Sequence, residues 1–475
     1  MLRPHFWIKI YLTLVSIMKK MFTKVFSAVL VSATVLAVTA KAQQTVLASA
    51  TTLNTKSEVK ADSTVTTTTT TAKPAAKADP AAWVPVRRLW GYAFGDLYYV
   101  QHAPPITSTQ GKENNYTGVP TYRNAFQFRR IYLGYDYDIT KKFKAEFLLA
   151  SEPSASTGVV NATTATVQNS DNLVDGKMAL YIKNINVRVR DLWNGTDLVV
   201  GEMSTPTFAL NEPGTNAPTS LAEATWSYRS IERTITDYHK DNSYDVGASL
   251  QGTFDPKTKN FGYVVMVGNN STASLLSAAN ANTGFYKIFY GDIWGKFLNQ
   301  KLYVDFYADY AQTAPNTATV GEQSHNMYKL FAAYNAKYFT IGAEAYTQNF
   351  KNGVTNKTTN KAEDATAKGL SVWIRGAIVQ GKWGYFARYD NYNPDNNFNP
   401  ADPYTVNTNY GSYDPTTKEN FVTAGLDFTP TKNVHFMPNV WFTQYKDQLA
   451  PTTAGYLPDN HTLVYRMTFF FTFGK

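Results

Sequence analysis

From about residue 89 to its end, the chain alternates apolar and polar residues with a period of two, in segments of roughly ten residues. In Arg130–Ile139, for example, the odd-numbered positions are apolar or aromatic, and the even-numbered ones include Arg130, Asp136 and Asp138. A helix cannot sort such a set onto two faces, whereas a strand can. The connections between segments are alternately short and long. Together these features predict an all-β fold, a transmembrane antiparallel β-barrel with tight periplasmic turns and long extracellular loops.

About sixteen strands are expected, and an even number would leave both ends of the barrel on the periplasmic side. The predicted strands begin near Leu89, Ala125, Phe143, Leu180, Asp197, Tyr244, Asn260, Tyr286, Lys301, Met327, Phe339, Leu370, Trp383, Asn420, Val434 and Thr462. The connection through Asn356 is predicted to be one of the long loops. Trp294, Trp373 and Trp441 are among the aromatics expected in the girdles at the membrane surfaces.

The N-terminal segment has the organisation of a secretory signal. Lys19, Lys20 and Lys24 precede an apolar stretch over residues 25–38, and Ala40-Lys41-Ala42 forms a small-x-small cleavage site. We therefore expect residues 1–42 to be a signal peptide, with Met18 or Met21 as an alternative start. Removing its six basic residues lowers the formal charge of the chain from +9 to +3, which argues against a nucleic-acid partner.

The rest of the chain divides at about residue 82. Residues 43–82 are rich in Thr and Ala without a periodic apolar face, which indicates a disordered periplasmic linker; an attachment arm for cell-wall polymer is the alternative. Residues 83–475 form the predicted barrel. The absence of cysteine excludes disulfides, thiolate metal sites, a cysteine nucleophile and a lipoprotein anchor.

Several segments of the predicted barrel resemble the porins grouped as phosphate-selective porin O and P. The matching segments, in chain order, are Phe128-Arg129-Arg130-Ile131-Tyr132-Leu133-Gly134, Gly201-Glu202-Met203 with Pro206 and Phe208, Glu232-Arg233 ahead of Asp245-Val246-Gly247 and Gly252, Ala387-Arg388-Tyr389-Asp390, and Gly425-Leu426-Asp427. The second segment departs from the family pattern at Glu202 and Met203 and carries Thr207 as an insertion. The resemblance implies a sixteen-stranded, usually trimeric channel whose third long loop folds inward, and which in the best-known members passes phosphate.

Taking the apolar face of each strand as lipid-facing assigns a set of charged residues to the lumen, where a porin does its work. The basic members are Arg130, Lys144, Arg188, Arg190, Lys329, Arg375, Arg388 and Arg466. The acidic members are Asp136, Glu146, Glu202, Asp305, Asp309, Glu344, Asp390 and Asp427. Arg129, on the opposite parity, is expected to reach the outer headgroups from the lipid face.

This mixed set leaves three interpretations open. Pore arginines can select anions, opposed acidic and basic ladders can create a transverse field, or the charges can simply pair with one another in a solvated wall. The third long loop, residues 207–242, is the predicted constriction, and an ordinary surface loop is its alternative. Its charged and aromatic candidates are Glu223, Trp226, Arg229, Glu232, Arg233, Asp237 and Lys240.

No catalytic or metal-binding motif accompanies these residues. None of the six histidines has a partner at the spacing of a zinc site or catalytic triad, so neither an enzyme nor a cofactor or metal site is predicted. The acidic loop containing Asp395, Asn397 and Asn399 lacks the final Glu of a calcium loop and is expected to form turns through its Asx side chains.

The sequence thus predicts an integral outer-membrane porin of a Gram-negative cell. It would contact lipid and lipopolysaccharide, assemble as a homotrimer, and pass small hydrophilic solutes, with a preference for anions or phosphate as a further option. Two alternatives stay open. One is a barrel that acts as an adhesin or ligand-binding receptor through its loops, and the other is a secreted β-rich glycan-binding protein.

Overall fold

The computed structural model of the protein describes residues 83–104, 119–151, 173–174, 177–178, 180–208, 234–239, 243–270, 286–313, 321–401, 404–406 and 416–474. By internal contacts the chain divides into residues 1–82 and Trp83–Lys475, and all of the described residues belong to the second unit. The predicted signal peptide and linker lie outside the described residues. None of the helices in the described part of the chain has both the length and the apolar character needed to cross a membrane.

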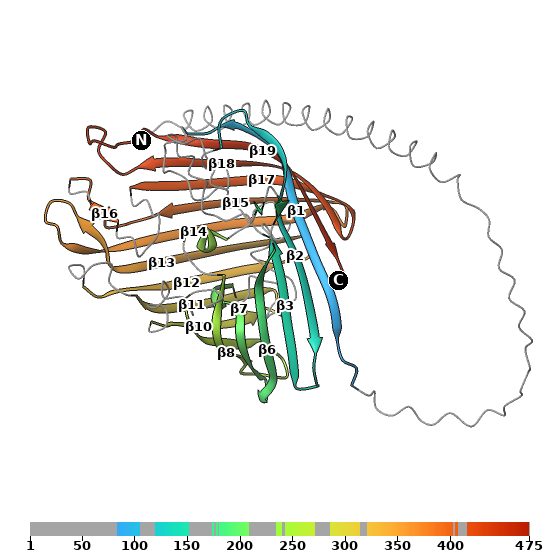
Figure 1. The fold of residues 1–475 in the computed structure, drawn as a ribbon. Coiled ribbons are helices and arrows are strands. Elements are labelled where there is room, and N and C mark those ends of the chain that lie inside the picture. The colour runs from blue at the N-terminus through green and yellow to red at the C-terminus, as the bar shows by residue number, and fades with distance from the viewer. Residues whose placement is uncertain are drawn as a thin grey trace, which may run out of the picture. The chain divides into compact units, whose positions relative to one another are not determined.

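Sixteen strands form one closed antiparallel barrel, as the sequence predicts (Figure 1). Each strand pairs with its neighbours in chain order, and the first strand also pairs with the last, so the barrel has no free edge. Its first eight strands are β1 (Arg87–His102), β2 (Asn124–Asp138), β3 (Phe143–Ser151), β6 (Tyr181–Trp193), β7 (Thr196–Ser204), β8 (Tyr244–Thr253), β9 (Phe261–Gly268) and β10 (Ile288–Phe297). The other eight are β11 (Leu302–Thr313), β12 (Gln323–Asn335), β13 (Phe339–Asn356), β14 (Ala362–Val379), β15 (Trp383–Asn393), β17 (Thr417–Thr431), β18 (Val434–Asp447) and β19 (Asn460–Phe473).

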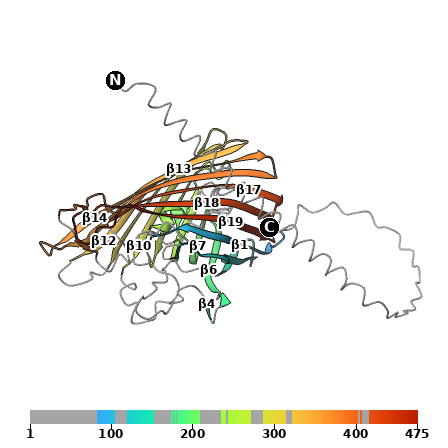
Figure 2. The same ribbon diagram turned by 90° about the horizontal axis from the view of Figure 1, so that it is seen from above.

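The remaining elements are short. A separate two-stranded sheet, β4 (Leu173–Val174) with β5 (Lys177–Met178), lies in the connection between β3 and β6 (Figure 2). The strand β16 (Tyr404–Val406) pairs with the end of β13. The 3-10 helix η1 (Pro206–Phe208) and the helical turn α3 (Ile235–Tyr238) belong to the third long connection, between β7 and β8.

The two faces of the barrel wall differ as a membrane requires. Apolar side chains such as Phe289, Ile293 and Leu330 are more than half exposed on the outer face, at 58%, 57% and 54%. The alternate residues of the same strands point inward and are buried, among them Tyr290 and Phe331. Because lipid cannot satisfy open backbone groups, a closed sheet with an apolar exterior is one of the two architectures that can span a bilayer. The fold therefore indicates an integral outer-membrane protein.

One predicted long loop is instead an extension of two strands. The sequence placed the start of the strand near Leu370, whereas β14 begins at Ala362 and β13 continues to Asn356. A short turn over residues 357–361 joins them, and the amide of Asn360 donates to the carbonyl of Asn356 at 2.9 Å. The prediction failed because the polar ends of a hairpin that projects beyond the membrane lack the apolar alternation that marks a spanning segment.

The tryptophan prediction was also wrong for three residues. Trp294, Trp373 and Trp441 are 4%, 2% and 1% exposed, and they lie on the inner face in the hydrophobic clusters of the barrel. Trp383, at 39% exposed, is on the outer face. Position near the end of a strand is not sufficient to assign an aromatic residue to a girdle, because parity decides which face it joins.

Candidate functional site: the inner wall

A β-bulge turns two consecutive arginines into the barrel. In the pairing of β1 with β2, Phe94 lies opposite Arg130 and Gly95 lies opposite Phe128, so that Arg129 is the additional residue. Arg129 and Arg130 are 1% and 4% exposed. The expectation that Arg129 reaches the outer headgroups is therefore wrong. A bulge breaks the two-residue alternation that the parity assignment assumed.

Arg129 belongs to a buried charged group that closes the barrel seam. Its Nη1 donates to Asp96 Oδ2 at 3.0 Å, while Nη2 of Arg466 donates to Asp96 Oδ1 at 2.6 Å. The Thr468 hydroxyl donates to the same Oδ1, also at 2.6 Å. Both guanidinium groups lie over the ring of Trp441, at 5.1 Å and 4.1 Å from its centroid. We call Asp96, Arg129, Arg130 and Arg466 the basic group.

Arg130 completes the basic group through a different contact. Its Nη1 donates to the hydroxyl of Tyr132 at 2.9 Å. The group thus brings three arginines and one carboxylate together on β1, β2 and β19. Guanidinium stays ionised under all physiological conditions, so the described residues of this part of the inner wall include three permanent positive charges and one carboxylate.

Carboxylates predominate on the far side of the ring. Asp292 on β10, Asp305 and Asp309 on β11 and Glu344 on β13 are all 5% exposed or less, and one lysine, Lys329 on β12, lies among them. We call these five residues the acidic group. In the closed ring of sixteen strands, β11 is eight strands away from β1 in either direction. The basic and acidic groups therefore occupy opposite walls.

Two members of the acidic group contact the third long connection. Lys329 Nζ donates to the carbonyl of Thr207 in η1, and it lies 4.0 Å from Glu344 Oε2. The backbone of Ile235, at the start of α3, lies close to the carboxyl group of Glu344. Thr207 and Ile235 are both fully buried. The segment that leaves β7 and the segment that returns toward β8 thus both contact the inner wall at adjacent strands.

The returning segment also reaches other strands. The His239 ring stacks on Tyr392 of β15, with centroids 3.4 Å apart, and its Nε2 is 4.0 Å from Glu419 Oε2 of β17. Tyr238 joins a buried apolar cluster with Phe421 and Trp441. Asp237, one of the predicted constriction residues, accepts a 2.5 Å hydrogen bond from Ser243. The other predicted constriction residues, Glu223, Trp226, Arg229, Glu232, Arg233 and Lys240, lie outside the described part of the chain.

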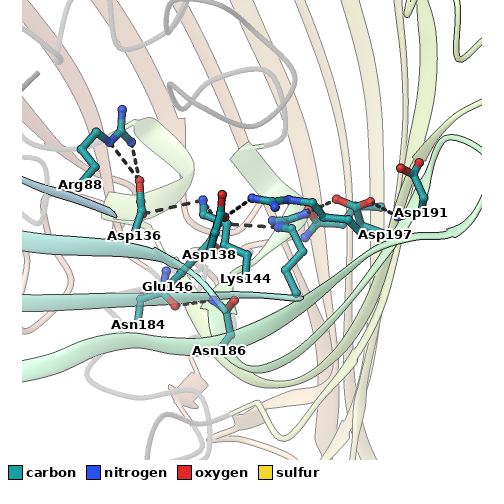
Figure 3. Close-up of polar contacts among 12 residues, drawn as sticks. Arg88, Asp136, Asp138, Lys144, Glu146, Asn184, Asn186, Asp191 and Asp197 are labelled. Carbon is teal, nitrogen blue, oxygen red and sulfur yellow. Dashed lines mark hydrogen bonds and ion pairs between the residues drawn. The ribbon is translucent and has the colours of Figure 1, made fainter. Parts of the chain in front are cut away.

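A ladder of ion pairs crosses the inner wall over β1, β2, β3, β6 and β7, near the tight turns that join β2 to β3 and β6 to β7 (Figure 3). Basic and acidic side chains alternate along it, so each predicted pore cation here has an acidic neighbour. The N–O contacts are Arg88–Asp136 (2.5 Å), Asp136–Lys144 (3.8 Å), Lys144–Glu146 (2.7 Å), Glu146–Arg188 (3.7 Å), Arg188–Asp197 (3.2 Å) and Arg190–Asp138 (2.5 Å). Lys144, Arg188 and Arg190 therefore contribute little net positive charge to the wall.

The remaining predicted residues are mostly paired as well. Arg388 forms a bidentate ion pair with Asp390, and both side chains are buried. His435 Nδ1 lies at hydrogen-bond distance, 2.9 Å, from Asp427 Oδ1. Arg375 is half-buried and has the same inward parity as Trp373 on β14.

The strand register corrects the prediction that Glu202 faces the lumen. Glu202 pairs with Ile185 of β6, which is 51% exposed on the outer face, so the register gives Glu202 outer-face parity rather than a place in the lumen. Its side chain is nevertheless only 6% exposed. The parity was misassigned because Leu198, Val199 and Val200 are apolar on both faces of β7, and a period of two cannot orient such a strand.

The Asx-rich loop behaves as expected. Asp395 Oδ1 accepts from the amides of Thr366 and Asn397, both at 2.9 Å, and Asn399 Oδ1 accepts from the amide of Ala401 at 3.0 Å. These side chains therefore serve the backbone turns. Among the described residues, no group of three or more His, Asp or Glu side chains is arranged to hold a metal ion.

Comparison with known proteins gives structural neighbours only. No family model matches the chain, and no curated protein matches it in sequence. The outer membrane channel DcaP of Acinetobacter baumannii superposes with a TM-score of 0.51 at 9% identity, covering 82% of this chain and 97% of that one. The two proteins therefore share the barrel fold. The anion-selective porin from Comamonas acidovorans (TM-score 0.49, 13% identity, 82% and 100% covered) and Salmonella typhi OmpF (0.49, 11%, 81% and 97%) are also similar.

Proposed function

We propose that the protein is a general diffusion porin, through which small hydrophilic solutes cross the outer membrane down their gradients. The fold supports this proposal, because barrels of sixteen or more strands are wide enough to enclose an aqueous channel. The observation that carries it furthest is the placement of the basic and acidic groups on opposite walls. A passing solute would experience a transverse field between the arginines and those carboxylates that are ionised.

This arrangement favours the transverse-field interpretation over a dedicated anion filter. Most of the predicted pore cations have an acidic partner in the ladder or in the Arg388–Asp390 pair. Arg129 and Arg466 both pair with Asp96, and Arg130 adds a third guanidinium next to Arg129 on β2. We propose that any preference for anions or phosphate depends on these three arginines. We also propose that the barrel assembles as a homotrimer, as the family resemblance implies.

Reversal potentials in a planar bilayer test the field directly. Arg130→Gln removes a positive charge without leaving Asp96 unpaired, and Asp309→Asn removes a carboxylate from the opposite wall. For an ion passing at roughly 10 Å, one charge contributes about 0.4 kcal/mol in water, or about a twofold change in the permeability of each ion and about a fourfold change in the cation-to-anion permeability ratio. We expect R130Q to shift selectivity toward cations and D309N to shift it toward anions.

Lys351→Gln is the control, since Lys351 forms an exposed ion pair with Glu322 and should leave the potential unchanged. Unchanged potentials in both test variants would remove the two groups from the selectivity mechanism. A folded barrel that conducts no ions would instead favour the adhesin or receptor alternative. Recovery in the soluble fraction without detergent would favour the secreted glycan-binding protein.

A further inference from the structure

Five successive tight turns carry exposed lysines at the same rim of the barrel. They join β8 to β9, β10 to β11, β12 to β13, β14 to β15 and β17 to β18, so the antiparallel order of the strands places all five on one side of the membrane. The short turns of outer-membrane barrels face the periplasm. We call the exposed lysines of these turns the lysine arc, and its members are Lys257, Lys259, Lys301, Lys337, Lys382 and Lys432.

The barrel itself does not neutralise the lysine arc. The same five turns contain one acidic residue, Asp255, and its carboxylate accepts hydrogen bonds from the Thr258 hydroxyl and from the amides of Asn260 and Phe261. Among the residues that the structure describes, none of the six lysine side chains forms an ion pair. The arc therefore presents uncompensated positive charge to whatever surrounds this rim.

Backbone hydrogen bonds hold the lysine arc in a row. Each of the first four turns accepts a bond from the next hairpin along the ring. The bonds, written from amide to carbonyl, are Lys296–Asn260 (2.7 Å), Asn335–Lys301 (2.7 Å), Ala377–Tyr338 (3.0 Å) and Thr429–Lys382 (2.9 Å). Neighbouring strands lie about 4.8 Å apart, so successive turns lie about 10 Å apart along the rim. The sheet thus fixes the spacing of the arc.

Exposed apolar side chains accompany the lysines in these turns. Phe254, Leu298 and Tyr338 are 67%, 64% and 60% exposed, and Trp383 follows Lys382 on the outer face. The ammonium group of Lys337 lies 4.9 Å from the centroid of the Tyr338 ring. Aromatic rings concentrate at the boundary between hydrocarbon and headgroups, and lysines beside them extend to the headgroups. A lipid leaflet therefore fits this rim better than a soluble polymer does.

The lysines of the β13–β14 hairpin, at the opposite rim, have different neighbours. Lys351 pairs with Glu322 at 3.3 Å, and Lys357 and Lys361 lie in a polar turn. The described residues 351–364 include two exposed acidic side chains and no aromatic residue. These three lysines provide a matched control, because they carry the same charge without the apolar surroundings.

We propose that the lysine arc binds the headgroups of anionic phospholipids in the leaflet that faces the periplasm. The ammonium groups donate hydrogen bonds to phosphate oxygens, and the exposed rings of Phe254, Tyr338 and Trp383 lie at the level of the headgroups. This binding requires the barrel and its rim, and it is independent of whether the lumen conducts.

Electron spin resonance of spin-labelled phospholipids measures the proposed preference. The full-length protein is reconstituted into phosphatidylcholine vesicles that contain a trace of spin-labelled phosphatidylglycerol or spin-labelled phosphatidylcholine, and the fraction of each label that the barrel immobilises is compared. One lysine near an anionic membrane surface favours association about fivefold, so averaging over all lipids around the barrel should leave phosphatidylglycerol favoured at least about twofold. The preference should fall in 1 M salt, where the Debye length is about 3 Å.

Combined substitution of three successive turns tests the arc itself. Lys337→Gln, Lys382→Gln and Lys432→Gln together should remove most of the preference. The corresponding triple arginine variant keeps the charges and should retain it. Heat-modifiable migration on gels establishes that each variant is a folded barrel.

The matched control removes the same charge from the opposite rim. Lys351→Gln, Lys357→Gln and Lys361→Gln together should leave the preference at the parental level. An equal loss in both triple glutamine variants would assign the effect to net charge and overturn the proposal.

The remaining outcomes separate the arc from its rivals. Equal immobilisation of the two labelled lipids by the parent would overturn the proposal. Retention of the parent, but not of the arc variant, on isolated cell walls would then assign the arc to an acidic cell-wall polymer. Conductance measured after reconstitution distinguishes the proposed function: a lipid preference in a barrel that never conducts would support the arc and refute the porin, whereas conduction without a preference would refute the arc alone.

Discussion

Substitution of Asp96 by Asn should destabilise the barrel more than any change at an exposed charge. Asp96 is fully buried, and its two oxygens accept from Arg129 at 3.0 Å and from Arg466 at 2.6 Å. The asparagine side chain has nearly the same shape but no charge, so the variant leaves two buried guanidinium groups facing a neutral amide. Breaking a buried ion pair by removing one partner costs about 3–5 kcal/mol.

The structure gives a matched control on the same barrel. Glu322 and Lys351 form an ion pair at 3.3 Å with both side chains about half exposed, and exposed pairs contribute about 0–1 kcal/mol. We therefore expect Glu322→Gln to change the free energy of unfolding by no more than about 1 kcal/mol. Asp96→Asn should change it several times more.

Urea-induced unfolding from lipid vesicles, followed by tryptophan fluorescence, measures both values. Trp441 lies against both guanidinium groups, so its emission also reports whether they have moved. A D96N variant that unfolds at the same urea concentration as E322Q would refute the view that Asp96 holds the seam between β1, β2 and β19.

Two further predictions concern the backbone and a turn. Gly201 has a φ of 130°, and a Cβ there would lie 2.4 Å from the carbonyl oxygen of Ile185, so Gly201→Ala should cost at least about 2 kcal/mol in the same unfolding assay. Gly381→Ala, with a φ of 72° and nothing within 4 Å of its Cβ, should cost only about 1 kcal/mol; equal costs would contradict the predicted clash. In the turn between β8 and β9, desolvation alone would raise the pKa of Asp255, but hydrogen bonds from Thr258 and from the amides of Asn260 and Phe261 lower it below its usual value. The stabilisation that this carboxylate contributes is present above its unfolded-state pKa and is lost as pH falls through its lower folded-state pKa. Hydrogen-exchange protection of the Asn260 and Phe261 amides should therefore fall on acidification in the parent protein. In Asp255→Asn the protection should not depend on pH.

The strand pattern could be read from the sequence because it depends on a local property. A strand with lipid on one side must present apolar residues at every second position, and β19 does so with Leu463, Tyr465, Met467 and the phenylalanines that follow at the same spacing. Where a strand was apolar on both faces, as at Val199 and Val200, the same reasoning assigned Glu202 to the wrong face. At the bulge in β2, which inserts one residue, the same reasoning placed Arg129 on the lipid-facing side of the barrel.

The charged inner wall could be predicted in composition but not in arrangement. The sequence indicates which charged residues face inward on most strands. Because acidic residues are among them, the sequence does not favour an anion filter over simple charge pairing. It gives no sign that Arg466 contacts Asp96, 370 residues away, or that Lys329 contacts Thr207. These contacts exist because closing the barrel brings β19 beside β1 and because one connection returns to the inner wall.

By itself, then, the sequence determined a membrane barrel of sixteen strands, since periodicity and turn spacing are written residue by residue along the chain. Only the tertiary structure decided which charges meet and which walls oppose each other. Those properties depend on closure and register, and a shift of a single residue at one bulge changes the face that a side chain joins.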